Sequence, residues 1–241
     1  MRAGIIESVA LRLRFEVWAK LRAGRHASFD LSHSQFGEDM IVRTLCSGVE
    51  RGVYVDIGAH HPVYFSNTYY FYRRGWHGLN VDANPGTKRL FDVLRPRDVN
   101  VEACVGAEPG ATVEFFCFDN PALNTTDAEM ARRAQELSGA RLVSRRSFRT
   151  ETLVDLVARC LPGTSVDILN IDIEGVDEQV LMHHDWSKLR PRILIFERHG
   201  LDPLAAREDH VIRHLREVGY EVRGVAGPSW IMSLSGAGAG G

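Results

Sequence analysis

The chain has 241 residues and a mass of 27.0 kDa, enough for one α/β domain whose core needs neither disulfides nor a metal. Hydrophobic residues make up 44% of it and charged residues 25%, which is typical of a soluble globular protein. The formal net charge of -2 excludes the strong positive field expected of a nucleic-acid-binding protein. Any substrate preference is therefore expected to come from a local site.

The cysteines and the apolar runs indicate the compartment. Cys46, Cys104, Cys117 and Cys160 are widely spaced and form no CxxC pair, so neither a zinc cluster nor a disulfide framework is expected. No apolar run approaches the length of a membrane span. These features favour a cytoplasmic protein with free thiols.

The two ends of the chain differ from its middle. Residues 1–33 predict a helical extension, because apolar residues recur every four positions from Ile5 to Leu21 with basic residues between them. We expect this helix to pack on its own domain or on the partner of a homodimer, in preference to an anionic lipid surface. Residues 235–241, rich in Gly and Ala, predict a flexible tail.

Residues 34–234 alternate between short apolar runs and helical patterns. Strands are expected within 52–59, 77–85, 98–106, 113–119, 166–175 and 190–200, and helices within 66–74, 87–94, 125–139, 150–161 and 208–219. The final run, 220–234, predicts a β-hairpin. Strand and helix in this alternation predict an α/β fold with a doubly wound, mostly parallel sheet and a C-terminal antiparallel hairpin.

Polar residues follow the expected strands. Ligands of a doubly wound sheet bind beyond the carboxyl ends of its strands, so the residues just after each strand are the site candidates. These candidates are Asp56, Gly58, Ala59, His60 and His61 after the first strand, Asp82 and Asn84 after the second, and Asp172, Glu174, Glu197 and His199 after the last two parallel strands.

Gly58 and Asp82 indicate the cofactor. A glycine in the first turn lets a ligand approach the backbone, and an acid at the end of the next strand can accept both hydroxyls of a ribose. A dinucleotide also needs the G-x-G-x-x-G turn for its pyrophosphate, whereas here a single glycine is followed by Ala59 and His60. This favours S-adenosylmethionine over NAD. The alternative is purely structural: Gly58 forms a tight turn, and the acids at the strand ends are surface residues.

Three segments resemble successive signatures of FkbM-family methyltransferases. They are SQFGEDMIV (34–42), VYVDIGAHHPVYFSNTYYFYRRGWHGLNVDANP (53–85) and ILNIDIEGVDEQVL (168–181), and the similarity extends over residues 34–200. The resemblance implies a Rossmann-like class I methyltransferase fold and a hydroxyl acceptor on a sugar or polyketide. It also implies that Asp56, Gly58 and Ala59 hold the methionine part of S-adenosylmethionine and that Asp82 holds its ribose.

This sequence departs from the family pattern at two places. It has Asp82-Ala83-Asn84-Pro85 where many members have Glu-Pro-Asn-Pro, a change that keeps the carboxylate. It has His60-His61-Pro62 where members have Asn-Asp-Gly or similar. His60 is expected to contact the methionine carboxylate or the acceptor, with a cap or surface role as the alternative, and His61 is expected to have no role in the site.

Methyl transfer to a hydroxyl requires alignment and a group that takes the proton. Asp172 is the first candidate for the base, Glu174 for its supporting acid, and His199 is the second candidate for the base. Glu174 is equally well explained as a carboxylate at a helix N-terminus. Asp172 with Glu197 could instead hold Mg²⁺, which prefers oxygen ligands.

The sequence therefore predicts an S-adenosylmethionine-dependent O-methyltransferase that acts on a hydroxyl of a sugar or a sugar-bearing natural product or polysaccharide. A nucleotide-linked oxidoreductase or epimerase is the first alternative, and a non-catalytic subunit with the same fold is the second. Acceptor specificity is expected in residues 119–147, interpreted as polar, mobile loops.

Overall fold

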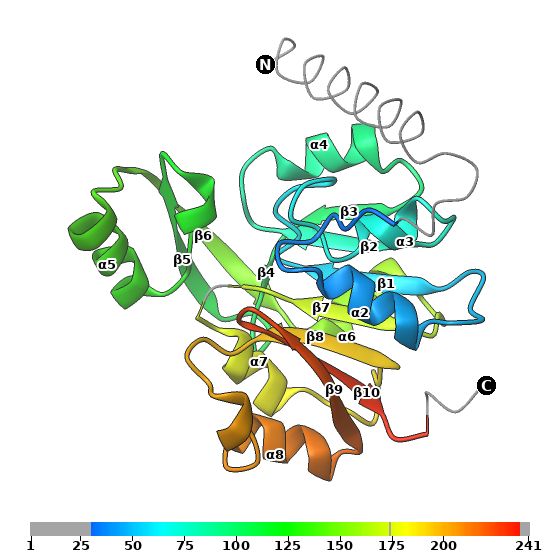
Figure 1. Cartoon of the computed structure of the whole chain (residues 1–241). Coiled ribbons are helices and arrows are strands. Elements are labelled where there is room, and N and C mark those ends of the chain that lie inside the picture. The colour runs from blue at the N-terminus through cyan, green and yellow to red at the C-terminus, as the bar shows by residue number, and fades with distance from the viewer. Residues whose placement is uncertain (1–29, 174, 237–241) are drawn as a thin grey trace. The chain divides into compact units, whose positions relative to one another are not determined.

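The computed structural model of the chain describes residues 30–173 and 175–236 (Figure 1). The predicted N-terminal helix, with the homodimer contact expected of it, and nearly all of the predicted tail lie outside the described residues. No helix within 30–173 and 175–236 combines the length and the hydropathy that crossing a membrane requires.

A seven-stranded sheet forms the centre of the domain, in the order β3-β2-β1-β7-β8-β10-β9. Its five parallel strands are β1 (Val53–Ile57), β2 (His77–Asp82), β3 (Val99–Glu102), β7 (Ile168–Ile171) and β8 (Ile193–Glu197). The hairpin β9 (Tyr220–Ala226) and β10 (Ser229–Leu234) adds two antiparallel strands beside β8. The strand order reverses between β1 and β7, which confirms the predicted Rossmann-like doubly wound fold.

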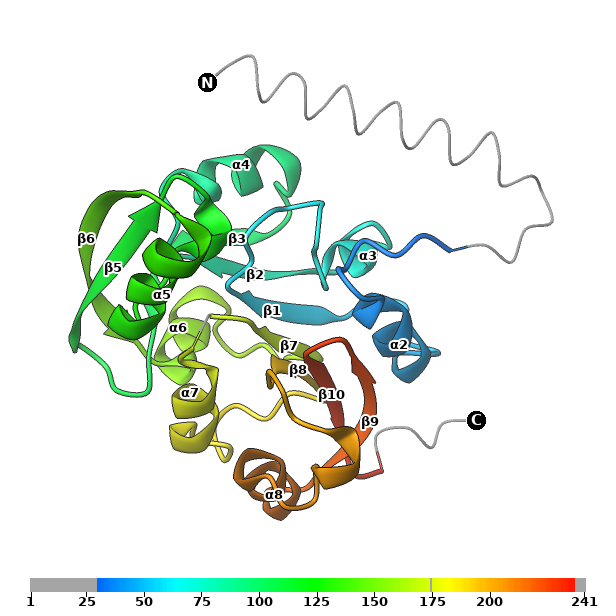
Figure 2. The same cartoon turned by 60° about the vertical axis from the view of Figure 1, so that its left-hand side comes forward.

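Helices cover both faces of this sheet. On one face α6 (Leu153–Cys160), α7 (Asp177–His183) and α8 (His210–Glu217) pack in one apolar core with strand residues such as Val55, Ile57 and Leu169. On the other face lie α2 (Glu38–Leu45), α3 (Tyr69–Tyr72) and α4 (Thr87–Leu94), of which α4 contacts β2 and β3. Figure 2 shows α6 and α7 on one side of the strands and α2 and α3 on the other. At the carboxyl ends of the parallel strands, the first residue of α2, Glu38, lies near Asp172 and Glu197.

A second, three-stranded sheet, in the order β4-β6-β5, stands beside the first. It consists of β4 (Cys104–Val105), β5 (Thr112–Phe118) and β6 (Leu142–Glu151), with the short 3-10 helix η1 (Pro121–Leu123) and helix α5 (Ala128–Ser138) between β5 and β6. Strand β6 is absent from the sequence prediction, because most of its residues face solvent and its polar pattern resembles a loop. Helix α5 lies within the helix expected at 125–139, whereas residues 142–147, expected to be loop, belong to β6.

Candidate active site

The ends of the parallel strands form one row. Val81 of β2 pairs with Ile57 of β1, and Ile57 pairs in turn with Ile171 of β7. Ile171 pairs with Phe196 of β8. One residue further along each strand stand Asp82, Gly58, Asp172 and Glu197, so the register brings four of the predicted site residues together at one edge of the sheet.

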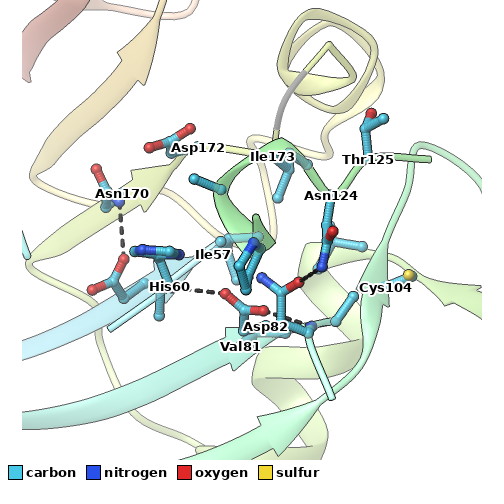
Figure 3. Close-up of a pocket in the computed structure, with 18 of the residues that line it drawn as sticks. Ile57, His60, Val81, Asp82, Cys104, Asn124, Thr125, Asn170, Asp172 and Ile173 are labelled. Atoms are coloured by element: carbon cyan, nitrogen blue, oxygen red, sulfur yellow. Dashed lines mark hydrogen bonds between the residues drawn. The ribbon is translucent and has the colours of Figure 1, made fainter. Parts of the chain in front are cut away.

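A cavity of about 290 Å³ opens along this row (Figure 3). Its lining includes seven of the predicted site residues, namely Asp56, Gly58, Ala59, His60, Asp82, Asn84 and Asp172. Pockets for small ligands and cofactors begin at roughly this volume. The cavity lies where the strand order reverses, which is where doubly wound sheets bind their ligands.

Gly58 is required by the packing of the strands themselves. Its backbone is left-handed, with φ at 77°, and a Cβ built on it would lie 1.6 Å from the carbonyl oxygen of Asp172. Any side chain here would push β7 away from β1. Gly58 therefore sets the spacing of the cavity floor, and its backbone N–H donates to Val81 rather than to a ligand.

Asp82 holds the two loops that border the cavity. One of its carboxylate oxygens accepts a hydrogen bond from the backbone N–H of His60 at 2.7 Å, and the other accepts from that of Asn84 at 2.6 Å (Figure 3). Burial raises the pKa of Asp82, and both hydrogen bonds oppose that rise. A carboxylate has about four acceptor positions, so these two bonds leave capacity for ligand hydroxyls.

The two adjacent histidines have different surroundings. His60 lines the cavity and has a left-handed backbone, with φ at 49°. His61 instead turns its Nδ1 toward the backbone N–H groups of Val63 and Tyr64, at 3.1 and 3.0 Å. Burial lowers the pKa of His61 to about 4, so at neutral pH its ring is uncharged and serves as a hydrogen-bond acceptor for the turn.

The segment after β5 closes one end of the cavity. The side chain of Asn124 donates to Asn84 and accepts from the backbone N–H of Phe118 (Figure 3). The neighbouring Thr125 and the thiol-bearing Cys104 line the same end. Burial raises the pKa of Cys104 to about 12, so at physiological pH its thiol is neutral and forms an apolar part of the cavity lining.

A layer of polar side chains lies beneath the cavity, and the sequence analysis does not predict it. Asp56 pairs in register with Asn80 and with Asn170, and Asn80 pairs with Asn100. Asn170 donates to Asp56 at 2.9 Å, and Asn80 donates to Asn100 at 2.9 Å. One sequence signal could have found this layer: LNVD, VNVE and LNID, in three strands, each place an asparagine two residues before an acid.

Arg95 joins this layer to the loop that follows β1. Its side chain is fully buried and donates to the carbonyl of Pro62 at 2.7 Å, to Ser66 at 2.6 Å and to Thr68 at 2.8 Å. It also donates to Asn80 and lies 3.9 Å from Asp98. Arg95 therefore fixes residues 62–68, and the predicted helix 66–74 is reduced to Tyr69–Tyr72 because Ser66 and Thr68 take part in this network.

Asp56, predicted to hold part of the cofactor, belongs to the same network. It lines the cavity, yet its two oxygens accept hydrogen bonds from Thr68 at 2.6 Å and from Asn170. Burial raises the pKa of Asp56, while Arg95 and both donors lower it.

The proposed catalytic residues occupy different positions. Asp172 lines the cavity, and Glu197 lines an adjoining recess that also includes Asp172. The side chain of His199 is 72% exposed and lies 2.7 Å from Glu197, outside the lining of both hollows. Glu174 lies outside the described residues.

A model of the FkbM methyltransferase domain matches residues 56–222 of this sequence. The match covers more than two thirds of the chain and includes every parallel strand end described above. The chain belongs to the FkbM methyltransferase family.

Comparison with solved structures gives only distant similarity for this FkbM-family protein. A TehB-like SAM-dependent methyltransferase from Corynebacterium glutamicum shares 12% identity, with a TM-score of 0.42 over 98% of this chain and 100% of that chain. The O-methyltransferase from Bacillus cereus, in complex with SAH, shares 13% identity, with a TM-score of 0.36 over 96% and 90% of the two chains. No curated protein matches the sequence significantly.

The first signature of the FkbM resemblance, residues 34–42, is built into the site. Gln35 lines the cavity, and Asp39 is buried with its oxygens accepting from Ser34 at 2.8 Å and from the backbone N–H of His33 at 2.7 Å. Glu38 is buried as well and accepts from Ser229 at 2.9 Å. The start of α2 is thereby fixed against the strand ends.

The residues that the structure describes do not define a magnesium site. Within 30–173 and 175–236, no three His, Cys, Asp or Glu side chains are grouped so that they could hold a metal ion. Asp172 and Glu197 supply two carboxylates, and Glu174, the neighbouring acid, lies outside the described residues. The proposed chemistry therefore takes no step through a metal.

Proposed function

We propose that this FkbM-family protein is an S-adenosylmethionine-dependent O-methyltransferase that methylates a hydroxyl of a sugar or of a sugar-bearing natural product or polysaccharide. The observation that carries the proposal is the single row of Asp82, Gly58 and Asp172 along one cavity, in a chain of a methyltransferase family. The four cysteines are free thiols, which supports a reducing, cytoplasmic setting.

The cavity fits S-adenosylmethionine by the chemistry of its two ends. At one end Asp82 has the acceptor capacity to bind the ribose hydroxyls, and the neutral wall formed by Cys104, Phe115 and Asn124 suits an adenine. At the other end Gly58, Ala59 and His60 present the turn expected to hold the methionine part. A sulfonium cation is favoured by the carboxylate of Asp172 in the same cavity.

Bound there, S-adenosylmethionine supplies an activated methyl group: the acceptor oxygen forms the new O–C bond while the C–S bond breaks and its electron pair returns to sulfur. Asp172 accepts the proton of the attacking hydroxyl, which is general base catalysis. Glu197, one residue beyond the β7–β8 pairing, lines the adjoining recess together with Asp172.

The test uses S-adenosylmethionine with a labelled methyl group and a panel of methyl glycosides, with the label followed into the glycoside by mass spectrometry. Asp172→Asn is expected to lower turnover by about 10²- to 10⁴-fold. Its affinity for S-adenosylhomocysteine, which carries no sulfonium charge, should remain near that of the wild type. Glu217→Gln, an exposed acid on α8, is the matched control and should leave turnover unchanged.

Turnover by Asp172→Asn equal to the wild-type value would remove Asp172 as the base, and His199→Ala would then test the second candidate. A wild-type protein that binds S-adenosylmethionine but labels no glycoside would contradict the saccharide acceptor. In that case the non-catalytic alternative becomes the one to pursue.

A further inference from the structure

A small recess of about 10 Å³ adjoins the cavity on the β8 side, with room for one water molecule or one hydroxyl group. Gln35, Phe65, Asn67, Asn170 and Asp172 line both hollows, so the recess opens directly onto the proposed position of methyl transfer. Glu38, Glu197 and Ser229 complete the polar lining of the recess. A ligand in the cavity that places a hydroxyl group in the recess would meet Asp172 from the side opposite the Asp82 end.

Phe65 is the unusual residue of this lining. Its side chain is 64% exposed, although most large apolar side chains of the domain are buried. Its backbone is left-handed, with φ at 54°, a conformation rare for bulky residues and one that stores strain. Strain of this kind persists only where the surrounding structure enforces it, and it gathers at ligand sites.

The loop that carries Phe65 is fixed on both sides. Arg95 binds the carbonyl of Pro62 before it and the hydroxyl of Ser66 after it. The backbone N–H of Ser66 donates to His33 at 3.0 Å, and Asn67 donates to Asn170 at 2.9 Å. The loop therefore holds the exposed ring at a defined position. The entropic cost of ordering this loop arises when the protein folds, so it does not weaken ligand binding.

The chemistry of the recess indicates a neutral, polyhydroxylated ligand. The carboxylate of Glu197 accepts hydrogen bonds from hydroxyls, and the amides of Gln35 and Asn67 both donate and accept. The buried Glu38 already accepts from Ser229 and from the backbone N–H of Phe36. The lining of the recess includes no arginine or lysine among the described residues, which disfavours a phosphate group on the ligand part that lies there. The face of an aromatic ring suits the C–H face of a sugar ring.

We propose that Phe65 is the platform of the acceptor subsite, on which a neutral sugar ring stacks while one of its hydroxyls reaches Asp172. Gln35, Asn67 and Glu197 would bind further hydroxyls at the mouth of the recess. This inference rests on the proposed methyltransferase function and adds to it the residue that selects a sugar ring over other hydroxyl compounds.

Saturation-transfer NMR on the protein loaded with S-adenosylhomocysteine tests the platform, with a panel of methyl glycosides as probes. Wild type is expected to transfer saturation to ring C–H protons, and Phe65→Leu to bind the same glycoside roughly tenfold more weakly. Phe65→Tyr should restore binding. Tyr64→Leu is the matched control, because Tyr64 is an exposed aromatic of the same loop whose ring contacts His61 and lines neither hollow.

Equal glycoside affinity in wild type and Phe65→Leu would overturn the platform and leave the proposed function standing. Failure of every glycoside to bind the loaded wild type would overturn the saccharide subsite. Calorimetric binding of S-adenosylhomocysteine to the same samples separates these results from failure of the methyltransferase proposal, which would show as no binding of that ligand.

Discussion

Gly58 faces Asp172 so closely that no other residue fits between the two strand ends. A Cβ on Gly58 would lie 1.6 Å from the Asp172 carbonyl oxygen, and the backbone φ of 77° already disfavours a side chain. Gly58→Ala is therefore expected to lower the free energy of unfolding by about 2–4 kcal/mol, from overpacking and left-handed strain together.

Gly86 provides the matched control for that substitution. Its φ is 84°, yet a Cβ there would have no atom within 4 Å. Gly86→Ala should therefore cost only about 1 kcal/mol in urea denaturation. Equal losses in the two variants would show that the contact with Asp172 does not limit position 58.

Arg95→Met tests the buried polar network. Burial raises the pKa of both Asp56 and Asp98, and Arg95 opposes each rise. Removing one partner from a buried charge cluster costs about 3–5 kcal/mol. The surface control Arg89→Met, at an exposed position of α4, is expected to cost about 0.5 kcal/mol or less.

The effect of Arg95→Met should depend on pH. Without Arg95 the pKa values of Asp56 and Asp98 rise further in the folded protein. The unfolded pKa of an aspartate is about 3.9. A carboxyl with a higher pKa in the folded protein contributes its full stabilisation only below about pH 3.9, and this stabilisation is lost as the pH rises through the folded pKa. The deficit in unfolding free energy should thus be larger at pH 8 than at pH 5, and a pH-independent deficit would contradict the account.

The cysteines are expected to react unequally with a thiol reagent. Cys46, Cys104 and Cys117 are buried, and burial raises the pKa of Cys46 and Cys104 to about 12. Cys160 is only partly buried. At pH 8 one thiol of the native protein should therefore react, and slowly. Cys160→Ser should abolish this reaction, and all four thiols of the wild type should react after denaturation. Rapid reaction of two or more native thiols would contradict the packing described here.

The strand ends could be predicted from sequence because buried parallel strands have a simple sequence pattern. Apolar runs that end in Asp82 and Asp172 indicate both the sheet and the edge at which these acids meet. Helix α4 was expected over residues 87–94 and is Thr87–Leu94 in the structure. Local pattern was sufficient at these positions because each element buries one regular face.

Other features depend on contacts distant in the sequence. Arg95 stands in the polar stretch RPRD and resembles a surface residue, and only the folded chain surrounds it with Pro62, Ser66 and Thr68. Strand β6 forms because β5 and β4 pair with it, against its own polar pattern. The left-handed Phe65 has no sequence signal, since glycine or asparagine is the usual residue in that conformation.

The central claim is that the cavity beside Asp82 binds S-adenosylmethionine, and calorimetric titration of wild type and Asp82→Ala tests it most directly. Wild type is expected to bind S-adenosylmethionine and not NAD. Asp82→Ala should bind about 10- to 150-fold more weakly, since a charged hydrogen-bond partner contributes about 1.5–3 kcal/mol. Unchanged affinity in Asp82→Ala, or binding of NAD in place of S-adenosylmethionine, would contradict the account.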